Sequence, residues 1–542
     1  MIGCQKPKGQ KGSALVVIAL IILLSSVLGL ALLSNTLTSH QSVLANENET
    51  RAKYLAEYAA TLGLDELQKE LEELSQQSGQ QVRQCGEIDD IVRELLNKFA
   101  NKSGVPVEQL KGEDFVYRLE FDESSLQEAK NLCEQNSAIG LQYAVKGYLV
   151  ASGIADKNGK LPKRVTFKVP IQITNVADVF NFALSAKENI WLNGGVEIHG
   201  SLYAGNALAF NKVAHFYDGY RYHFTSVYPE INGKISAGSP EKKGNEIYEI
   251  TYYDSKIIGN HNIKEYGSKV SIEQLNRKFY GNYKVSKVSF ITFPDLDMNQ
   301  IKEEIKTVTG FYAPPDSSRK TIFHKQSHGV DYYYITDAER VQKCTGEWGN
   351  RKCWYEWRES TTTFPIGANY GISKKGPYRG VYYINGKLDI DGDVDLQGTF
   401  YVNGDVSMQH TQKTDNPIAA AIIAKGEITI ANNNLYQDDP AILNAFFWSL
   451  SDDFVIYGVG SNLKINGGVI AKNIVLNGLR GSKNGKTISP NPQEYKDKNG
   501  KKWPSRLTIV YDEQFITHPP AGVPTNEGFK LSQIGQWEYV EE

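Results

Sequence analysis

Residues 386 to 409 read GKLDIDGDVDLQGTFYVNGDVSMQ, and this stretch divides into four successive units of six residues. Each unit begins with a glycine, at Gly386, Gly392, Gly398 and Gly404, and has apolar residues at its third and fifth positions. Apolar residues at every second position are typical of a strand with one buried face, and a short fixed period with glycine at the corners is typical of stacked strands. The repeat therefore predicts a mainly-β fold, a parallel β-helix or solenoid.

Weaker copies of the unit lie on both sides of it. They read IWLNGGVEIHGSLYAG at 190–205 and LKINGGVIAKNIVLNGLRG at 463–481. We therefore expect the first β-helix rungs at 179–210 and the rest of the β-helix at 381–515. An antiparallel meander is the alternative, because Asn-Gly and Asp-Gly pairs also form two-residue hairpins.

The segment 211–380 breaks the six-residue spacing and is rich in tyrosine and tryptophan, so we expect a large insertion there. Aromatic rings that carry a polar atom can stack on sugar rings and reach their hydroxyl groups. The insertion is therefore predicted to bind an insoluble polysaccharide such as cellulose. The candidate binding residues are Tyr332, Tyr333, Tyr334, Trp348, Trp354 and Trp357. The alternative is that these rings fill the core of the insertion.

The N-terminal region indicates the compartment. An uncharged, mostly apolar run extends from 14 to 33, and Lys6, Lys8 and Lys11 precede it. Twenty helical residues rise about 30 Å, the thickness of the hydrocarbon core of a bilayer. Basic residues before the run place the N-terminus in the cytoplasm and the rest of the chain outside. We expect a basic leader at 1–12 and a single-pass membrane protein whose body lies at the extracellular surface.

The remaining segments complete the expected organisation. Leucines recur at helical spacings beyond the apolar run, which predicts one transmembrane and amphipathic helix over 13–80. Mixed helical and alternating patterns predict a small α+β domain at 81–178, and 516–542 is expected to be a C-terminal tail. The 59 Lys and Arg residues against 62 Asp and Glu residues give a net charge of -3, so we expect no nucleic-acid partner.

Several N-terminal features resemble the PilX-type type IV pilus assembly proteins. They are the basic leader, the Gly12-Ser13 junction, the apolar run GSALVVIALIILL and the segment Tyr54-Leu55-Ala56-Glu57. The resemblance covers about residues 8–67. It implies that a prepilin peptidase cuts after Gly12, that Ser13 becomes the new N-terminus, and that the partners are the type IV pilus assembly machinery and other pilins. It also favours a β-helix, because PilX-like proteins of this length resemble ones with such a C-terminal domain.

One position departs from the pattern of major pilins. Val17 is the fifth residue after the expected cut, where major pilins carry a glutamate that neutralises the amino terminus of a neighbouring subunit. Its absence implies a minor or tip position in a pilus, and a plain signal anchor that no prepilin peptidase cuts is the alternative. The anchor, β-helix and aromatic insertion together are also similar to the tapirins, surface proteins that hold cells to cellulose.

The cysteines suit an exported body. Cys4 lies in the leader, and the four others are Cys85, Cys133, Cys344 and Cys353. An even number of cysteines outside the cytoplasm is typical of disulfides, and three pairings are possible. Proximity in the sequence favours Cys85 with Cys133 and Cys344 with Cys353, the latter closing a short aromatic hairpin. Unpaired or zinc-binding cysteines are the alternative.

Sequence motifs of catalysis are scarce. His324 and His328 form HxxxH without the glutamate of a zinc protease, and DIDGDVD at 389–395 lacks the spacing of an EF-hand. We therefore expect no metal, no cofactor and no catalytic residue. The predicted function is non-catalytic, in pilus assembly or adhesion. A membrane-anchored β-helix polysaccharide lyase or hydrolase with a hidden carboxylate pair is one alternative, and a purely structural minor pilin is the other.

Overall fold

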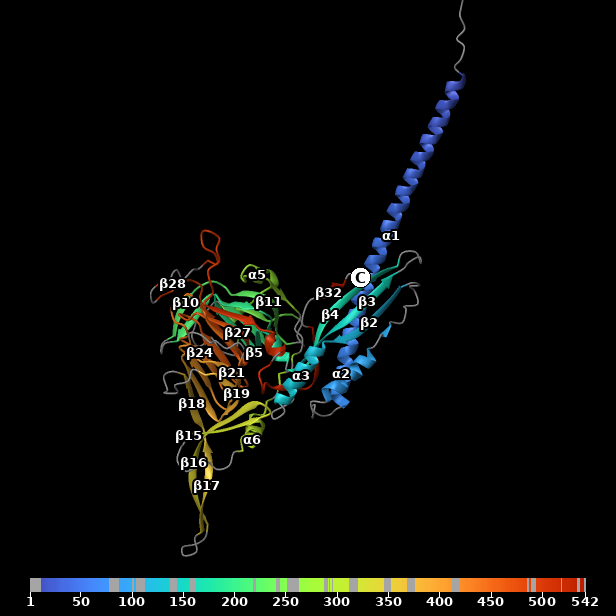
Figure 1. Cartoon of the computed structure of the whole chain (residues 1–542). Helices are drawn as coiled ribbons and strands as arrows, with labels where there is room; N and C mark the ends of the chain where they lie inside the picture. The colour runs from blue at the N-terminus through green and yellow to red at the C-terminus, as the bar shows by residue number, and fades with distance from the viewer. Residues whose placement is uncertain are drawn as a thin grey trace, which may run out of the picture.

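The structure is a computed structural model of the chain. It describes residues 11–77, 87–99, 102–103, 113–136, 144–155, 162–176, 178–217, 221–239, 244–250, 263–286, 291, 293–294, 296–310, 320–345, 352–367, 376–411, 420–484, 487–488, 494–517, 519–533 and 537–540. Figure 1 shows three parts: the long helix α1 (Lys11–Gln77), an α+β domain built on the second half of this helix, and a large block of strands beside that domain.

Helix α1 has two halves with different surroundings. It runs unbroken for 67 residues, as the leucine spacing and the apolar run predict. Large apolar side chains from Val16 to Leu37 are more than half exposed, whereas Leu67 and Leu71 are buried. The second half therefore belongs to the core of a domain, and the first half extends away from the body (Figure 1).

The α+β domain is completed by the end of the chain. Its helices are α2 (Glu87–Lys98) and α3 (Glu123–Asn136), and its strands are β1 (Lys102–Ser103), β2 (Glu113–Phe121), β3 (Ala144–Ala155), β4 (Lys163–Val176), β31 (Thr525–Gln533) and β32 (Glu538–Val540). The antiparallel order is β1-β2-β3-β4-β31, and β32 also pairs with β4. The expected tail at 516–542 is thus wrong, because Trp537 packs 5.9 Å from Phe167 of β4 and continues this domain.

Small residues bring α1 close to the sheet. The helix buries Ala52, Ala56, Ala59 and Ala60 completely. A Cβ atom at Gly153 of β3 would lie 2.2 Å from the carbonyl oxygen of Ala52, so only glycine fits there. The helix backbone therefore rests almost directly on β3, and this contact joins the apolar half of α1 rigidly to the body.

The strand block is built mainly from parallel strands, and we call it the parallel-strand stack. Its paired strands are β5 (Leu184–Gly194), β6 (Glu197–His199), β7 (Leu202–Ala204), β8 (Ala207–Asn211), β11 (Glu230–Ala237), β12 (Ile247–Ile250), β16 (Val330–Thr345), β18 (Thr362–Gly367), β19 (Tyr378–Ile384), β20 (Gly386–Asp391), β21 (Leu396–Val402), β22 (Val406–Gln409), β23 (Ala420–Ala424), β24 (Ile428–Ala431), β25 (Ala441–Ser449), β26 (Asp453–Tyr457), β27 (Leu463–Gly478) and β30 (Leu507–Tyr511). Each strand from β19 to β24 pairs in parallel with the second strand after it. These pairs confirm parallel sheets and exclude the antiparallel meander.

The six-residue repeat explains the register. Leu388 pairs with Val406 and Tyr378 with Leu396, each eighteen positions later, so three units make one circuit of the chain, which we call a coil. The apolar third and fifth positions of all four units are at most 3% exposed. Gly386 has φ of 151°, and a Cβ there would lie 1.8 Å from the carbonyl oxygen of Thr362 in the preceding coil. The glycine is required because the coils approach each other through backbone at this corner.

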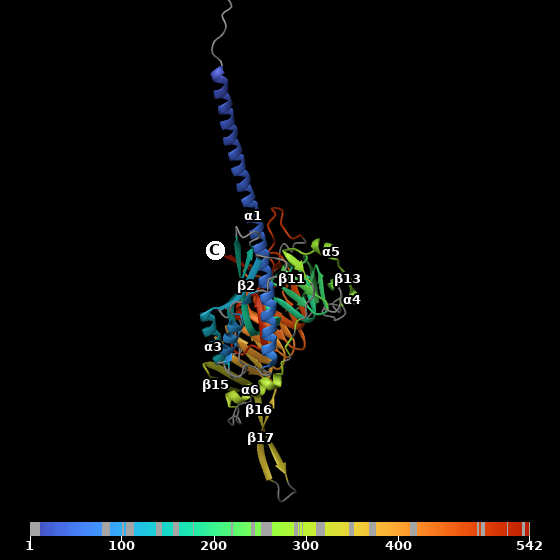
Figure 2. The ribbon, with the colours of Figure 1, turned by 90° about the vertical axis from the view of Figure 1, so that its right-hand side faces the viewer.

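The order of the coils in space differs from their order in the chain. The chain enters at β5, in the middle of the stack, and passes through β7, β8, β11 and β12 to one end. The crossover containing α6 (Met298–Thr309) leads to the opposite end, and the strands from β16 to β27 return to the middle, where β27 pairs with β5. Figures 1 and 2 both place α5 (Ile272–Asn276) and α6 at opposite ends of the stack.

The segment 211–380 accordingly differs from the expected insertion. Strands β11, β12, β16 and β18 lie in this range, β19 begins in it, and all five pair with the stack. The coils in this range lack the six-residue spacing because hairpins and helices interrupt them. The remaining elements are η1 (Asp178–Asn181), β9 (Val213–Tyr217), β10 (Arg221–Thr225), α4 (Ile263–Tyr266), β13 (Gly267–Lys269), β14 (Tyr283–Val285), β15 (Lys320–Ser327), β17 (Lys352–Ser360), β28 (Lys483–Asn484), β29 (Thr487–Ile488) and α7 (Gln514–Thr517). Of these, β14 also pairs in parallel with β11 of the stack.

The entry and exit of the stack lie together at one junction. The ring of Phe180, in η1, lies 4.9 Å from Phe515, in α7, and Phe446 of β25 lies 4.0 Å from Phe515. The amide of Gln172 in β4 donates to the carbonyl oxygen of Ile516 at 3.2 Å. The stack is therefore inserted between β4 and β31 of the α+β domain.

Buried asparagines connect the two halves of the stack across their meeting point. Asn193 donates to Asn477 at 3.1 Å and accepts from Asn211 at 2.6 Å, and these three residues are at most 1% exposed. Asn189 donates to Asn473 in the same way at 3.0 Å. Because buried amides are costly without partners, these ladders specify one register between β27 and β5.

Replacing Asn193 by alanine should destabilise the stack. The Nδ2 group of Asn211 loses its buried acceptor, so we expect the free energy of unfolding to fall by about 1–3 kcal/mol in urea titrations. The matched control is Asn466→Ala, because Asn466 makes the same kind of contact with Asn444, at 2.9 Å, in a half-buried position where water can replace it. Equal losses in the two variants would contradict the role given to the buried ladder.

Candidate functional site

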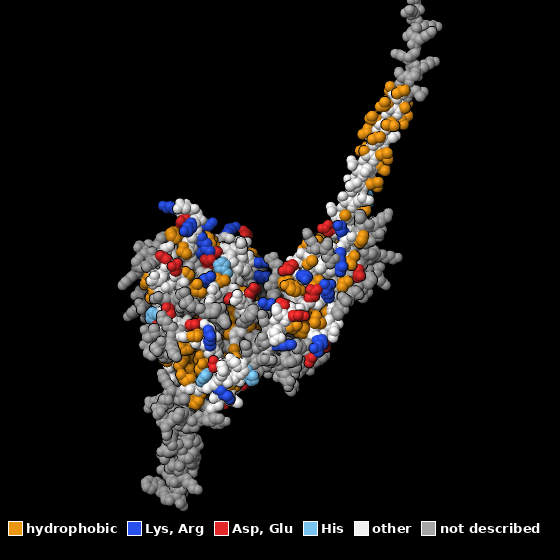
Figure 3. All heavy atoms as spheres, in the orientation of Figure 1, with side chains coloured by type: hydrophobic (Ala, Val, Ile, Leu, Met, Phe, Trp, Pro, Cys, Tyr) orange, Lys and Arg blue, Asp and Glu red, His pale blue; other side chains and the backbone are white. Residues whose placement is uncertain are grey.

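The first candidate surface is the apolar stalk, residues 16–37 of α1. Among the described residues, α1 is the one helix long and apolar enough to cross a membrane, with a window of mean hydropathy 3.0 that the body does not bury. Figure 3 shows hydrophobic side chains along the face of this helix that is in view. The hydroxyls of Ser26 and Thr36 donate to carbonyl oxygens four residues earlier, at 2.7 and 2.8 Å. These two hydroxyls are therefore satisfied within the helix, and the apolar stalk suits a lipid or helix-bundle environment.

The expected processing site lies at the start of this helix. Gly12 and Ser13 belong to the first turn of α1, whereas residues 1–10 of the leader lie outside the described residues. Val17 is 55% exposed at the position where a glutamate would stand in a major pilin. Cleavage after Gly12 stays a prediction.

The tyrosine run is mostly core. Tyr332 and Tyr334 are 1% and 0% exposed, and they pack with Tyr383 and Tyr401 on the outer face of the β16–β19–β21 sheet. Residues of α6 and α7 belong to the same buried cluster and cover this face. The prediction that Tyr332 and Tyr334 bind a ligand is therefore wrong: both faces of the sheet are covered, so the alternating pattern has no solvent side.

Tyr333 points to the opposite face and is half-buried. Its ring stacks on His324 at 4.5 Å and on Tyr382 at 4.3 Å, and Tyr382 stacks on Phe400 at 4.7 Å. This column of rings ends at the exposed His324, whose Nε2 lies 2.8 Å from Asp331. Across the described part of the chain, no group of three or more His, Cys, Asp or Glu side chains could hold a metal ion.

The second candidate surface is the β16–β17 hairpin. Figure 1 shows that it extends from the end of the stack that is farther from the start of α1. Cys344 stands opposite Cys353 in the register, Lys343 opposite Trp354, and Arg340 opposite Trp357. The expected hairpin is therefore present, whereas the Cys344–Cys353 disulfide stays a prediction.

The structure does not test the predictions for Cys85, Cys133 and Trp348. Trp348 and Cys85 lie outside the described residues, and Cys133 lies in α3. The Cys85–Cys133 pairing therefore also stays a prediction.

Ion pairs fix the base of the hairpin on α6. The carboxylate of Glu359 in β17 lies 2.5 Å from the Nζ of Lys302 and 2.6 Å from the Nζ of Lys306. Burial acts to raise the pKa of Glu359, but hydrogen bonds and charges from the two lysines outweigh it and lower the pKa. Burial, followed by the charge of Glu359, raises the pKa of the adjacent Tyr334. The base of the hairpin is thus held by an ionised carboxylate and a neutral phenol.

A buried carboxylate pair lies elsewhere in the stack. Glu197 and Glu230 are register partners, and Arg480 lies 3.3 and 2.7 Å from them. Lys502 also contacts both carboxylates, at 2.8 and 2.7 Å. Burial acts to raise the pKa of Glu230, but hydrogen bonds from Lys502 and Tyr495 and the charge of Arg480 lower it. This network joins the segment after β27 to β6 and β11, and an ionised Glu230 is an acceptor rather than a proton donor.

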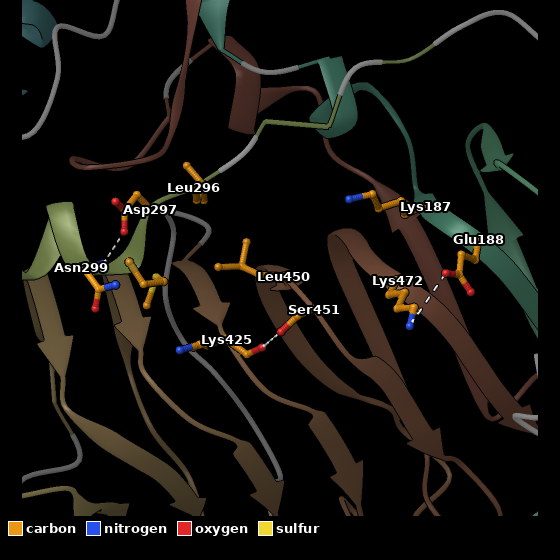
Figure 4. A pocket seen from close by; sticks show the side chains of 10 residues that line it. Lys187, Glu188, Leu296, Asp297, Asn299, Lys425, Leu450, Ser451 and Lys472 are labelled. Carbon is orange, nitrogen blue, oxygen red and sulfur yellow. Dashed lines mark hydrogen bonds and ion pairs between the residues drawn. The ribbon is translucent and has the colours of Figure 1, made fainter.

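The third candidate surface is a cleft of about 500 Å³ between the start of α6 and a corner of the stack (Figure 4). Its lining residues are Lys187, Glu188, Leu296, Asp297, Met298, Asn299, Lys425, Leu450, Ser451 and Lys472. These residues come from five separate segments of the chain, which is why no sequence motif indicates the cleft. The one signal that the sequence carries is a lysine beside or within an apolar strand: Lys425 follows β23, and Lys187 and Lys472 lie within β5 and β27.

Comparisons with known proteins give little. No protein-family model matches the chain, and no curated protein matches it. Among solved structures, the competence-associated pilin ComZ from Thermus thermophilus is similar at 12% identity and a TM-score of 0.24, over 81% of this chain and 86% of that chain. A likeness at this score establishes neither fold nor function.

Replacement of the buried tyrosines should lower the stability of the fold. We expect Tyr332→Ala and Tyr334→Ala each to lower the free energy of unfolding by about 3–5 kcal/mol, because each removes a large ring from the core. The control is Tyr54→Ala, since Tyr54 is 67% exposed and its loss should change stability by less than about 0.5 kcal/mol. Chemical denaturation of the three variants measures this. Unchanged stability in the Tyr332 and Tyr334 variants would contradict their assignment to the core.

Proposed function

We propose that this chain is a non-catalytic surface protein of the type IV pilus system, a PilX-like minor pilin whose β-helix body carries the β16–β17 hairpin toward polysaccharide. The observation that carries the proposal is the construction of α1. One continuous helix has an exposed apolar half followed by a half that forms the core of the α+β domain. Such a helix can leave a bilayer and enter a filament while its domain stays folded.

The mechanism has two stages. The stalk first resides in the bilayer, with the N-terminus in the cytoplasm, and after processing it packs against the helices of other pilins. The hydroxyls of Ser26 and Thr36 in the stalk, and of Thr38 directly after it, already donate within the helix, so these groups need no new partner on transfer. Val17, in place of a glutamate, gives no charge partner for a neighbouring amino terminus, which favours a tip or minor position.

The body suits presentation of a binding surface. The pairing of every second strand from β19 to β26, with eighteen-residue coils at the glycine repeat, supports a β-helix, a rigid support. The hairpin lies at the end of this support that is remote from the stalk (Figures 1 and 2). Of the predicted binding aromatics, Trp348, Trp354 and Trp357 belong to the sequence of this hairpin, so adhesion is assigned to these three.

Processing tests the pilus assignment. In a host with an active prepilin peptidase, the mature protein should lack residues 1–12, because the peptidase is expected to cut after Gly12. Replacement of Gly12 by valine should abolish this loss of mass, whereas Gly9→Val, in the same leader, should not. Intact-mass measurement of the purified chains shows whether residues 1–12 have been removed. A wild-type chain that retains its first twelve residues would show a plain anchor.

Retention on insoluble polysaccharide tests the adhesion assignment. We expect full-length protein in detergent to be depleted by at least one of microcrystalline cellulose, chitin or xylan, and not by an inert particle. Replacement of Trp348, Trp354 and Trp357 by alanine should abolish the depletion while the thermal midpoint stays unchanged.

The matched control for this experiment is Phe224→Ala, which removes an aromatic ring that is 40% exposed on β10. The full chain is used because residues 52–71 of α1 lie in the core of the α+β domain, so a fragment that begins after the helix loses that core. No depletion of the wild-type protein would limit the function to pilus assembly, whereas equal depletion of the triple variant would show that the three tryptophans do not carry the binding.

A further inference from the structure

Three lysines of the cleft form a row along one corner of the stack. Ala424 pairs with Ser449, Trp448 with Ile470, and Ala471 with Ala186. Lys425 and Leu450 directly follow the first of these pairs, and Lys472 and Lys187 directly follow the last, so the four residues belong to four successive coils. The register of β27 against β5 shifts at this corner. Strands in a sheet are about 4.8 Å apart, which gives the row a length of about 14 Å.

The row crosses the meeting point of the two halves of the stack. Lys425 and Lys472 belong to the C-terminal half and Lys187 to the N-terminal half, and Figure 4 shows all three around one hollow. The row exists only because β27 pairs with β5. Lys187 and Lys425 are exposed, and Lys472 lies 3.8 Å from Glu188 with both side chains more than a third exposed. The ammonium groups are therefore accessible from solvent.

The opposite wall is the start of α6, and it adds polar and apolar groups. Asp297 caps the helix by accepting from the backbone N–H of Asn299 at 2.8 Å. Leu296 and Leu450 line the cleft beside the amide of Asn299 and the hydroxyl of Ser451. Three lysines against two carboxylates leave a net charge of +1 in the lining.

We propose that this cleft binds an acidic polysaccharide, a chain of sugars that carry carboxylates. An extended row of ammonium groups fits carboxylates spaced along a polymer, and leucines beside amide and hydroxyl groups fit the apolar faces and hydroxyls of sugar rings. Glu188 and Asp297 can accept from sugar hydroxyls, of which a sugar chain offers more than one in every unit and a nucleic acid at most the 2′-hydroxyl of RNA. The ligand is thus an acidic glycan rather than a nucleic acid, and the site is separate from the hairpin.

Binding of polygalacturonate to the full chain in detergent tests the proposal. We expect saturable binding that weakens as salt increases, and no binding of neutral dextran. Each of Lys187→Gln, Lys425→Gln and Lys472→Gln should weaken binding about twofold to fivefold, the range for one exposed ion pair. Asn299→Trp should abolish binding without changing the charge, because the indole fills the cleft from the α6 wall.

Two controls make the result specific to this cleft. Lys234→Gln removes an exposed lysine of β11, outside the cleft lining, and should leave binding unchanged. The Trp348, Trp354 and Trp357 triple variant should bind polygalacturonate normally, which separates this site from the proposed adhesive hairpin. Absence of binding, equal loss in the Lys234 variant, unaltered binding by Asn299→Trp, or equally strong binding of polyglutamate would each overturn the proposal.

Discussion

The closure of the chain at one junction constrains the whole body. Strands β4 and β31 are neighbours in the α+β sheet, so the segment between them must leave and return at the same place. A stack of coils normally has its ends far apart, yet here Phe180 and Phe515 pack together. The chain meets this condition by starting in the middle of the stack, building one end, crossing over through α6 and returning from the other end. The asparagine ladders between β5 and β27 then make the two halves behave as one stack.

This arrangement explains the burial of the tyrosines. The outer face of the β16–β19–β21 sheet faces the crossover and the returning segment, so it is covered where a simple stack would face solvent. Tyr401 donates its hydroxyl to the carbonyl oxygen of Gly522, which ties the returning segment to this face. Burial raises the pKa of Tyr332 to about 12, consistent with a neutral side chain in the core. The high aromatic content, which can indicate a binding surface, here serves mainly to pack a sheet against the segments that cover it.

The same crossover creates the cleft and positions the hairpin. The first turn of α6 forms one wall of the cleft, and Lys302 and Lys306 of that helix hold Glu359 at the base of β17. The same twelve-residue helix thus contacts both candidate binding surfaces. Both lie on the stack, which joins the α+β domain at the junction of Phe180 and Phe515. That domain contacts α1 through the close approach of Gly153 to Ala52.

The sequence by itself determined the elements that local periodicity encodes. The uncharged run at 14–33 predicted the exposed half of α1, and the glycine units at 386–409 predicted parallel stacked strands with their third and fifth positions buried. It did not show that 211–380 supplies coils to the stack, that 525–540 completes the first domain, or that Tyr332 and Tyr334 are core. Only the tertiary structure decided these points, because they depend on which strands meet across hundreds of residues. The cleft has the same origin, since Lys187 and Lys472 become neighbours only when β5 pairs with β27.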